Sequence, residues 1–250
     1  MPFTQAEIDL LGKASLLRGL SDLELQAVLA EARIQKSTDG AFFFLESDPA
    51  EKSYILLNGK VKLGQVTEVG QQVILGYVIP GRVVGISSML KKVTYPVSAQ
   101  AVGDCRALVW DQATINRLMD AYPRMGLNAL RIMAGQIREF QNTIRDLSTK
   151  RVEQRIARAI LRLARQSGRK IEAGVLIDLP LTRQDLAEMT GTTLYTVSRV
   201  LTEWENQGLV QSQRQRVVIR APHGLVKIGE DLPDPTEEKP KLLGKELCDL

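Results

Sequence analysis

The period of the hydrophobic pattern changes twice along the chain, which predicts three regions of different structure. Near the N-terminus, Ser21-x-x-Glu24 forms a capping box ahead of a short helix over residues 23–32. From about Ile34, short β-prone runs alternate with turn residues. From Gln112 the apolar residues recur at helical spacing instead. We therefore expect a β-domain, a helical centre and a separate C-terminal region.

The β-prone runs are short and closely spaced. They lie at 41–45, 54–57, 61–66, 72–78, 83–86 and 107–110. Turn residues such as Asn58-Gly59 and Pro80-Gly81 separate them. Many short strands with this spacing predict an antiparallel roll or barrel, although a generic β-sandwich would give much the same pattern.

A long helix after Pro123 carries a narrow heptad seam. Its apolar residues are alternately three and four positions apart, and polar or charged residues flank them. They are Leu130, Met133, Ile137, Phe140, Ile144 and Leu147. A helix that packs on a core usually has a wider apolar stripe. The seam predicts a two-stranded parallel dimer helix, with ordinary packing on the β-domain as the alternative.

A further helix is expected from near Lys150 to about Gly168, because Ser148-Thr149 breaks the seam. Beside its apolar stripe runs a basic one. The members of the basic stripe are Arg151, Arg155, Arg158, Arg162 and Arg165. A solvated face is the simpler interpretation, and a cationic surface near phosphates is the alternative.

The segment from Leu181 onward has the pattern of a helix-turn-helix followed by a hairpin. Thr182-x-x-Asp185 resembles a capping box, Gly191 supplies the tight turn, and Gly208 ends the second helix. The expected buried face of that helix is Val197, Val200, Leu201 and Trp204. A basic run at 213–216, followed by the strand-like run 217–219, is typical of a wing.

The exposed face of this second helix predicts sequence-specific DNA binding. An α-helix fits the major groove, where base edges present a distinct pattern of donors and acceptors, and Arg199 can donate a guanidinium fork to guanine. Helix N-termini favour phosphates. The expected DNA contacts are Arg183, Gln184, Thr192, Thr193, Tyr195, Ser198, Arg199, Thr202, Arg214 and Arg216. Two packed helices around a glycine turn also occur in proteins that never touch DNA, but the wing, the basic content and the dimer helix favour DNA.

Length and composition set the domain plan. We place a β-domain at 1–122, a dimerisation helix with its hinge at 123–148, and the DNA-binding domain at 149–229. Residues 230–250 are rich in Pro, Glu and Lys, which predicts a disordered tail. The chain has no secretion signal and no run of about 18 apolar residues. Its two cysteines fit a reducing compartment, so we expect a cytoplasmic protein without a membrane contact.

The sequence argues against an enzyme. It contains no Gly-rich phosphate loop, HExxH, Cys-x-x-Cys or GxSxG pattern, and its one histidine, His223, lies beyond the wing. A cyclic-nucleotide-binding module without DNA binding is a further alternative. So is a regulator that takes no ligand and is controlled by its abundance.

The segment LTRQDLAEMTGTTLYTVSRVLTEWENQGLV strongly resembles the DNA-binding motif of the CRP/FNR family of bacterial regulators. The LLNGKVKL and VIPGRVVG runs resemble that family's cyclic-nucleotide-type β-roll. The resemblance covers about residues 10–225 and implies an α+β fold: a jelly-roll sensor, a long dimerisation helix and a winged helix-turn-helix. It implies a homodimer that binds a near-palindromic site on double-stranded DNA and contacts RNA polymerase. Arg199 corresponds to a base-reading arginine of the family, and Ser198 to a position against the bases.

Departures from the family pattern concern both specificity and the signal. Tyr195 stands where the family often has a glutamate that accepts from cytosine, so the usual half-site is not expected. Members that bind cAMP carry Gly-Glu and Arg-Ser, whereas this chain has Gly85-Ile86 and Tyr95-Pro96. Sensing of cAMP in the usual manner is therefore not expected, because the arginine that pairs with the phosphate is missing.

The cofactor and the effector stay open at the level of sequence. A four-cysteine iron–sulfur cluster cannot form from Cys105 and Cys248 alone. Haem is an alternative, since Pro2 is similar to the proline ligand of the family's carbon-monoxide sensor, but the sensor domain has no histidine. The run from Tyr95 to Gln100 resembles the nitrogen-oxide-responsive branch, which makes nitrogen-oxide stress the leading candidate signal. Whether the protein activates or represses transcription is likewise undecided.

Overall fold

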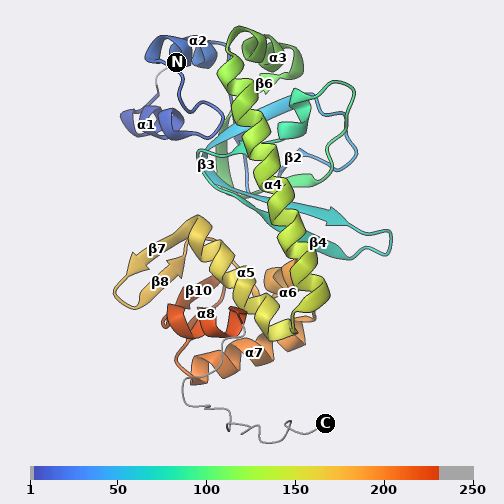
Figure 1. Ribbon diagram of the computed structural model, residues 1–250, viewed down its shortest axis with the longest axis vertical. Helices are drawn as coiled ribbons and strands as arrows, with labels where there is room; N and C mark the ends of the chain where they lie inside the picture. Colours follow the sequence, from blue (N-terminus) through green and yellow to red (C-terminus); the bar gives the residue numbers. More distant parts are fainter. Residues whose placement is uncertain (1–2, 231–250) are drawn as a thin grey trace, which may run out of the picture.

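Two α+β units are joined by one long helix, α4, which spans Pro123–Thr149 (Figure 1). The computed structural model describes residues 3–230. The helices of the N-terminal unit are α1 (Gln5–Lys13), α2 (Asp22–Ala30), the short 3-10 helix η1 (Ile86–Met89) and α3 (Gln112–Ala121). This arrangement confirms the predicted fold class: a β-roll, a long helix and a C-terminal helix-turn-helix.

The N-terminal unit is built on an antiparallel six-stranded sheet. Four strands follow the order β1-β6-β3-β4, while β2 pairs with β6 and β5 pairs with β3. The strands are β1 (Arg33–Ser37), β2 (Phe42–Phe44), β3 (Lys52–Val66), β4 (Gln72–Val78), β5 (Val83–Val84) and β6 (Ser98–Asp111). Trp110 fixes α2 to this sheet, because its indole N–H donates to the Val28 carbonyl at 3.1 Å.

Two predicted strands prove to be one. Residues 54–57 and 61–66 both belong to β3, which continues through Asn58-Gly59 by irregular pairing with β6 on either side of Asn58. Gly59 makes this continuity feasible, since its φ of +86° suits a glycine and its α-carbon lies against the β6 backbone. The predicted strand at 83–86 is shorter, because Ile86 begins η1.

The C-terminal unit combines four helices with a second antiparallel sheet, of order β7-β8-β10-β9. Its helices are α5 (Val152–Ser167), α6 (Arg183–Thr190), α7 (Leu194–Asn206) and α8 (Pro222–Glu230). Its strands are β7 (Gly168–Ile171), β8 (Gly174–Ile177), β9 (Val210–Gln213) and β10 (Arg216–Ile219). The β7–β8 hairpin was not anticipated from the sequence, because it gains a sheet only by pairing with β10, some forty residues further on.

The junction between α4 and α5 lies slightly later than predicted. The hydroxyls of Ser148 and Thr149 donate to the carbonyls of Ile144 and Arg145, so these residues continue the helix instead of breaking it. The chain leaves helical geometry at Lys150 and Arg151. The predicted tail begins at residue 230, but Glu230 closes α8, and residues 231–250 lie outside the described part of the chain.

Gly59 provides a stability test with a matched control. A β-carbon at this position would lie 2.6 Å from the Asp104 carbonyl oxygen and from the Cys105 Sγ. Gly70 has a similar φ of +79°, yet nothing lies within 4 Å of the corresponding point. Both alanine variants share the cost of the left-handed backbone, so the clash should cost Gly59→Ala about 1–3 kcal/mol more.

Urea denaturation of the two variants measures this difference in the free energy of unfolding. Equal midpoints for Gly59→Ala and Gly70→Ala would show that β3 and β6 move apart at this contact without loss of folding free energy.

Candidate nucleic-acid interface and sensor cavity

Helix α7 is held in place by one buried face. Thr193 caps its N-terminus, because its hydroxyl oxygen accepts from the Thr196 N–H at 3.2 Å. Gly191 makes the turn from α6 with φ +60°. The predicted inward residues are all buried, namely Val197, Val200, Leu201 and Trp204. The opposite face of α7 is consequently fixed toward solvent.

That outward face carries the side chains predicted to contact bases. Tyr195 is 78 % exposed, Arg199 and Thr202 are exposed, and Ser198 is half-buried. Within residues 3–230, the Arg199 guanidinium makes no hydrogen bond and no ion pair. Donors without internal partners are available to an external acceptor, so this face can bind the edges of base pairs.

Residues around α6 are placed less uniformly. The predicted capping box is present, since Thr182 N–H donates to the Asp185 carboxylate at 2.8 Å and the Thr182 hydroxyl accepts from Asp185 N–H. Arg183 is drawn inward, where its guanidinium donates to the Ser212 hydroxyl at 3.1 Å and lies 3.7 Å from the Glu205 carboxylate. Gln184 is exposed, and Thr192 and Thr193 border the turn beside the start of α7.

The wing is the β9–β10 hairpin. Its turn is Arg214-Gln215, and Gln215 adopts a left-handed φ of +60°. Arg214 and Arg216 are exposed, and neither forms an ion pair with a described residue. The hairpin therefore presents two cations that have no ion-pair partner among residues 3–230, and its strand β9 packs against α7.

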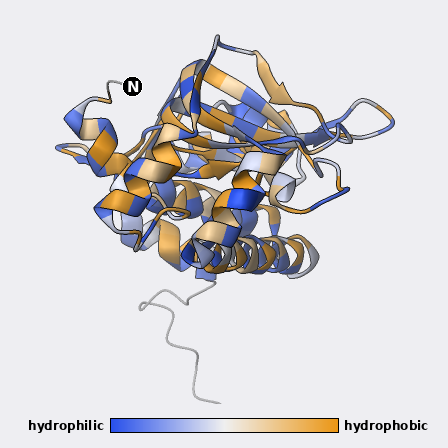
Figure 2. Ribbon diagram, turned by 90° about the horizontal axis from the view of Figure 1, so that it is seen from above, coloured by the Kyte–Doolittle hydropathy of each residue, from blue (hydrophilic) through white to orange (hydrophobic). Residues whose placement is uncertain are grey.

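The predicted seam of α4 is largely uncovered. Five of its six apolar residues are exposed, and Met133 is half-buried. Leu130 and Ile144 are each 64 % exposed, far more than expected for apolar residues that pack on their own β-domain. Figure 2, which views the molecule from above, shows hydrophobic and hydrophilic segments alternating along its helices.

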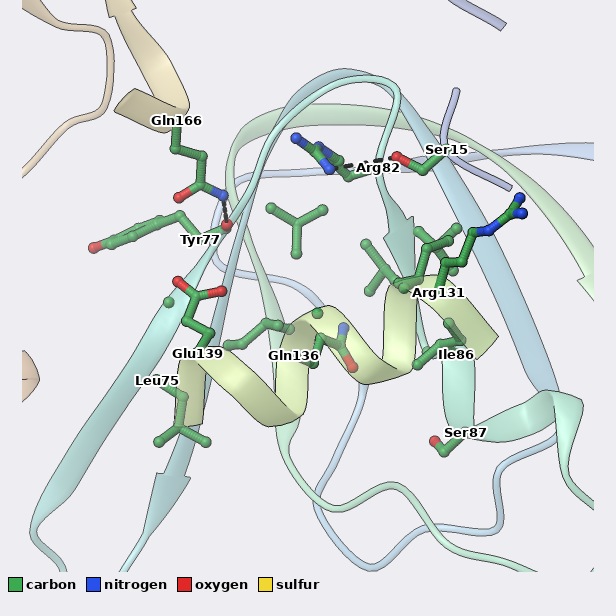
Figure 3. Close-up of a pocket in the computed structure, with 18 of the residues that line it drawn as sticks. Ser15, Leu75, Tyr77, Arg82, Ile86, Ser87, Arg131, Gln136, Glu139 and Gln166 are labelled. Carbon is green, nitrogen blue, oxygen red and sulfur yellow. Dashed lines mark hydrogen bonds between the residues drawn. The ribbon is translucent and has the colours of Figure 1, made fainter. Parts of the chain in front are cut away.

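A cavity of about 940 Å³ lies between the β-roll, α4 and α5 (Figure 3). Its lining includes Arg82, Ile86 and Tyr95 from the β-roll, Arg131 and Phe140 from α4, and Gln166 from α5. In Figure 3, Arg131, Gln136 and Glu139 project from α4, while Arg82 and Gln166 lie across the cavity from that helix. The volume lies in the range of small-molecule sites.

One end of this cavity is closed by stacked rings. Tyr95 is buried and lies parallel to Phe44 with ring centroids 3.6 Å apart. Its hydroxyl donates to the Lys52 carbonyl at 2.6 Å and accepts from the Lys52 N–H at 2.9 Å. Burial raises the pKa of Tyr95, which favours the neutral phenol in this wall of the cavity. Ile86 adds an apolar side chain nearby.

Comparison with known proteins assigns both units. Residues 154–228 match the Crp-like helix-turn-helix domain, and residues 34–122 match the cyclic nucleotide-binding domain. The transcriptional activator protein FnrA of Stutzerimonas stutzeri is 30% identical over 187 residues, which are 74% of this chain and 76% of FnrA. The chain belongs to the CRP/FNR family of transcription regulators.

Other CRP/FNR proteins support the same assignment. A CRP-like cAMP-activated global transcriptional regulator of Mycobacterium tuberculosis is 24% identical over 211 residues, covering 84% of this chain and 94% of that protein. The fold is that of FixK2 from Bradyrhizobium japonicum, with a TM-score of 0.70, 23% identity, and coverage of 79% and 96%. CooA from Carboxydothermus hydrogenoformans gives 0.68 at 19% identity, with coverage of 86% and 99%. The matched families and relatives are transcription regulators, and none is an enzyme family.

In this CRP/FNR chain, strand β4 joins the two units. Ile74 and Tyr77 belong to the β-roll by sequence, yet both are buried in the hydrophobic core of the DNA-binding unit. The β3–β4 register shifts at Leu75, which opposes no residue of β3, and this bulge turns Ile74 and Tyr77 to the same side. Burial, followed by the nearby Asp185 and Glu188 of α6, raises the pKa of Tyr77. The helix-turn-helix thus packs directly on the sensor.

The basic stripe of α5 is neither a purely solvated face nor a free phosphate surface. Arg158 binds the buried Asp146 of α4 at 2.9 Å and also Glu230 at 2.9 Å. Arg155 donates to the carbonyls of Leu147 and Gly191, and Arg162 lies 3.8 Å from Glu139. Most of the stripe therefore fastens α4 to the DNA-binding unit, because α5 packs its basic side under the end of α4.

Metal-binding clusters and membrane-spanning helices were sought in residues 3–230, the described part of the chain. There, no three His, Cys, Asp or Glu side chains are grouped to hold a metal ion. Cys105 is buried in the β-roll and donates to the Lys60 carbonyl, and burial raises the pKa of its thiol. His223 lies in α8, within the DNA-binding unit. No helix in this part of the chain is long and apolar enough to span a bilayer.

Proposed function

We propose that this CRP/FNR regulator binds a near-palindromic DNA site as a homodimer and that a signal in the β-roll cavity adjusts this binding. The observation that carries the proposal is the outward face of α7. Tyr195, Arg199 and Thr202 are exposed and have no side-chain partner among residues 3–230, and Ser198 on the same face is half-buried. The opposite face of the helix is fixed in a core. Residues 1–122 would sense, 123–148 would dimerise and 149–229 would bind DNA.

Residues of α7 would contact the bases, and residues near the helix N-termini and on the wing would contact the phosphates. Arg199, Tyr195, Ser198 and Thr202 share the outward face and would enter the major groove. Phosphate contacts fit the side chains near the helix N-termini and on the wing. They are Gln184, Thr192, Thr193, Arg214 and Arg216. Arg183 would serve mainly to hold α6 to the wing, since Glu205 and Ser212 bind its guanidinium.

Dimerisation would bury the seam of α4. Apolar side chains with heptad spacing and high exposure favour a parallel two-stranded coil. The two recognition helices would then be related by a two-fold axis and would read half-sites about one helical turn apart, roughly 34 Å. The protein would act in the cytoplasm. Its family membership suggests RNA polymerase as a further partner.

The signal would reach the DNA through β4. Leu75, Gly76 and Val78 line the cavity, while Ile74 and Tyr77 of the same strand pack in the DNA-binding core. A ligand that shifts β4 would therefore shift α6 without any intervening element. Nitrogen-oxide stress remains the leading candidate signal. Control by abundance alone is the rival, and a cavity that bound nothing would favour it.

The seam gives the first test of this function. Replacing Ile137 and Ile144 with aspartate would place charges inside an apolar interface at a cost of several kcal/mol. We expect the double variant to sediment as a monomer. The control is Arg138→Asp with Asn142→Asp, which puts two carboxylates on exposed positions outside the seam. A dimer that survives both pairs of changes would rule out this interface.

Arg199 should contribute to sequence-specific DNA binding, whereas Arg214 should contribute to binding of any DNA sequence. Arg199→Ala should weaken binding to a selected operator far more than binding to random DNA, because a bidentate guanine contact contributes about 1–3 kcal/mol of discrimination. Arg214→Ala should weaken both by similar factors and lower the salt slope by about one unit. Titrations on cognate and scrambled duplexes at several salt concentrations would decide. Equal losses for Arg199→Ala would reduce its role to phosphate binding.

Cyclic AMP should not act as the effector. Tyr95, stacked on Phe44 and bonded to Lys52, stands where a phosphate-binding arginine would be needed, and Ile86 offers no carboxylate. Calorimetry at millimolar cAMP should detect weak binding or none. Micromolar affinity together with tighter operator binding would contradict this expectation.

A further inference from the structure

The cavity is lined almost entirely by one sign of charge. Seven basic side chains line it against a single acidic one, Glu139, although the whole chain has 33 basic and 29 acidic residues. The basic residues are Lys13, Arg18, Arg82, Arg124, Arg131, Arg162 and Arg165. Glu139 lies 3.8 Å from Arg162, so it offsets only one of them.

Arg162 is half-buried and the other six cations are exposed residues; several of them have no partner among residues 3–230. Among residues 3–230, Arg18 and Arg165 donate no side-chain hydrogen bond and form no ion pair. Arg82 contacts only the neutral Ser15 hydroxyl, at 3.3 Å, and Arg131 only the Asn128 amide oxygen, at 3.2 Å. Guanidinium groups gathered without carboxylates repel one another, and a bound anion would relieve that repulsion.

The uncharged part of the lining includes polar side chains such as Ser87, Gln136 and Gln166, together with an apolar set. Phe44, Leu63, Ile86 and Ile132 line the same space. A hydrophobic wall with a few convergent charged groups is the usual construction of an organic-ligand site.

We infer that the cavity binds an amphipathic organic anion, whose apolar body lies against these four residues and whose charged group bridges Arg82 of the β-roll and Arg165 of α5. This inference rests on the proposed function and specifies the chemistry of its signal. Because the two arginines belong to different units, an anion between them would hold the DNA-binding unit against the sensor. The charged group would lie at the junction with α5, away from the wall formed by Tyr95.

A pair of dyes with one aromatic body tests the charge requirement. The probes are 8-anilinonaphthalene-1-sulfonate, which is an anion, and N-phenyl-1-naphthylamine, which lacks the sulfonate. Fluorescence titration of the full chain should show the anionic dye binding at least tenfold more tightly. Arg82→Gln combined with Arg165→Gln should weaken the anionic dye about tenfold and change the neutral dye less than twofold.

The control variant is Arg169→Gln with Arg220→Gln, which removes two exposed positive charges outside the cavity. It should leave both dyes unaffected. Equal affinity for the two dyes, or equal losses in the cavity and control variants, would overturn the inference. Operator binding by the wild-type protein is measured separately, with and without an extract of cellular metabolites. Absence of binding under both conditions would defeat the proposed function while leaving the dye result intact.

The start of α7 carries a second, independent feature. Leu194 is the first residue of the helix and is 47 % exposed, beside the more exposed Tyr195. Residues at the N-terminal end of a recognition helix are those that reach base edges, and the thymine methyl is the apolar group available in the major groove.

We also infer that Leu194 is a specificity-determining residue that contacts a thymine methyl group in each half-site. Replacing each thymine of a selected operator with uracil removes only that methyl. One position per half-site should lose about fourfold in affinity, as expected for one buried methyl. In Leu194→Ala this thymine-to-uracil difference should vanish, whereas Tyr195→Ala should retain it. A difference that persists in Leu194→Ala, or no sensitive position at all, would overturn this role.

Discussion

The burial of Ile74 and Tyr77 in the DNA-binding core is the contact on which the arrangement of the two units depends. It is apolar, it includes the first helix of the helix-turn-helix, and it comes from a strand that also lines the cavity through residues 75–78. A hydrogen bond from the Gln166 amide to the Tyr77 carbonyl, at 2.6 Å, fixes the same strand to α5. A displacement of β4 would therefore disturb both the β-roll cavity and the core of the DNA-binding unit.

The arginines of α5 have two distinct physical roles. Arg158 is bound to a buried carboxylate, and hydrogen bonding to Asp146 raises its pKa, so its charge contributes to the junction between the helices. Arg165 faces the cavity without such a partner. The same stripe thus supplies both the fastening of α4 to α5 and part of a cationic pocket. A helical spacing alone does not distinguish these roles, because it says nothing about which acidic residue lies opposite.

The β-roll cavity has a different lining from the Gly-Glu and Arg-Ser pattern of the members that bind cAMP. The stacked pair of Phe44 and Tyr95 fills one end with rings, and both Tyr95 hydrogen bonds are used on the backbone of Lys52. Positive charge lies instead around Arg82 and the helices. Such a distribution of charge would change the class of ligand that fits, while the β-roll, the long helix and the helix-turn-helix would stay as they are.

The sequence by itself determined the elements whose signals are local. Helical period, the capping box at Thr182, the turn glycine at Gly191 and the buried face around Trp204 each depend on neighbouring residues, so they could be predicted and were found as expected. Only the tertiary structure decided that β7 and β8 form a hairpin on β10 and that two predicted strands form one strand through Gly59. It also decided that Arg183 lies against Glu205 and that seven cations line one cavity. Each of these depends on residues distant in the chain, whose meeting is set by packing and by the cost of burying unpaired charge, and no short-range pattern records it.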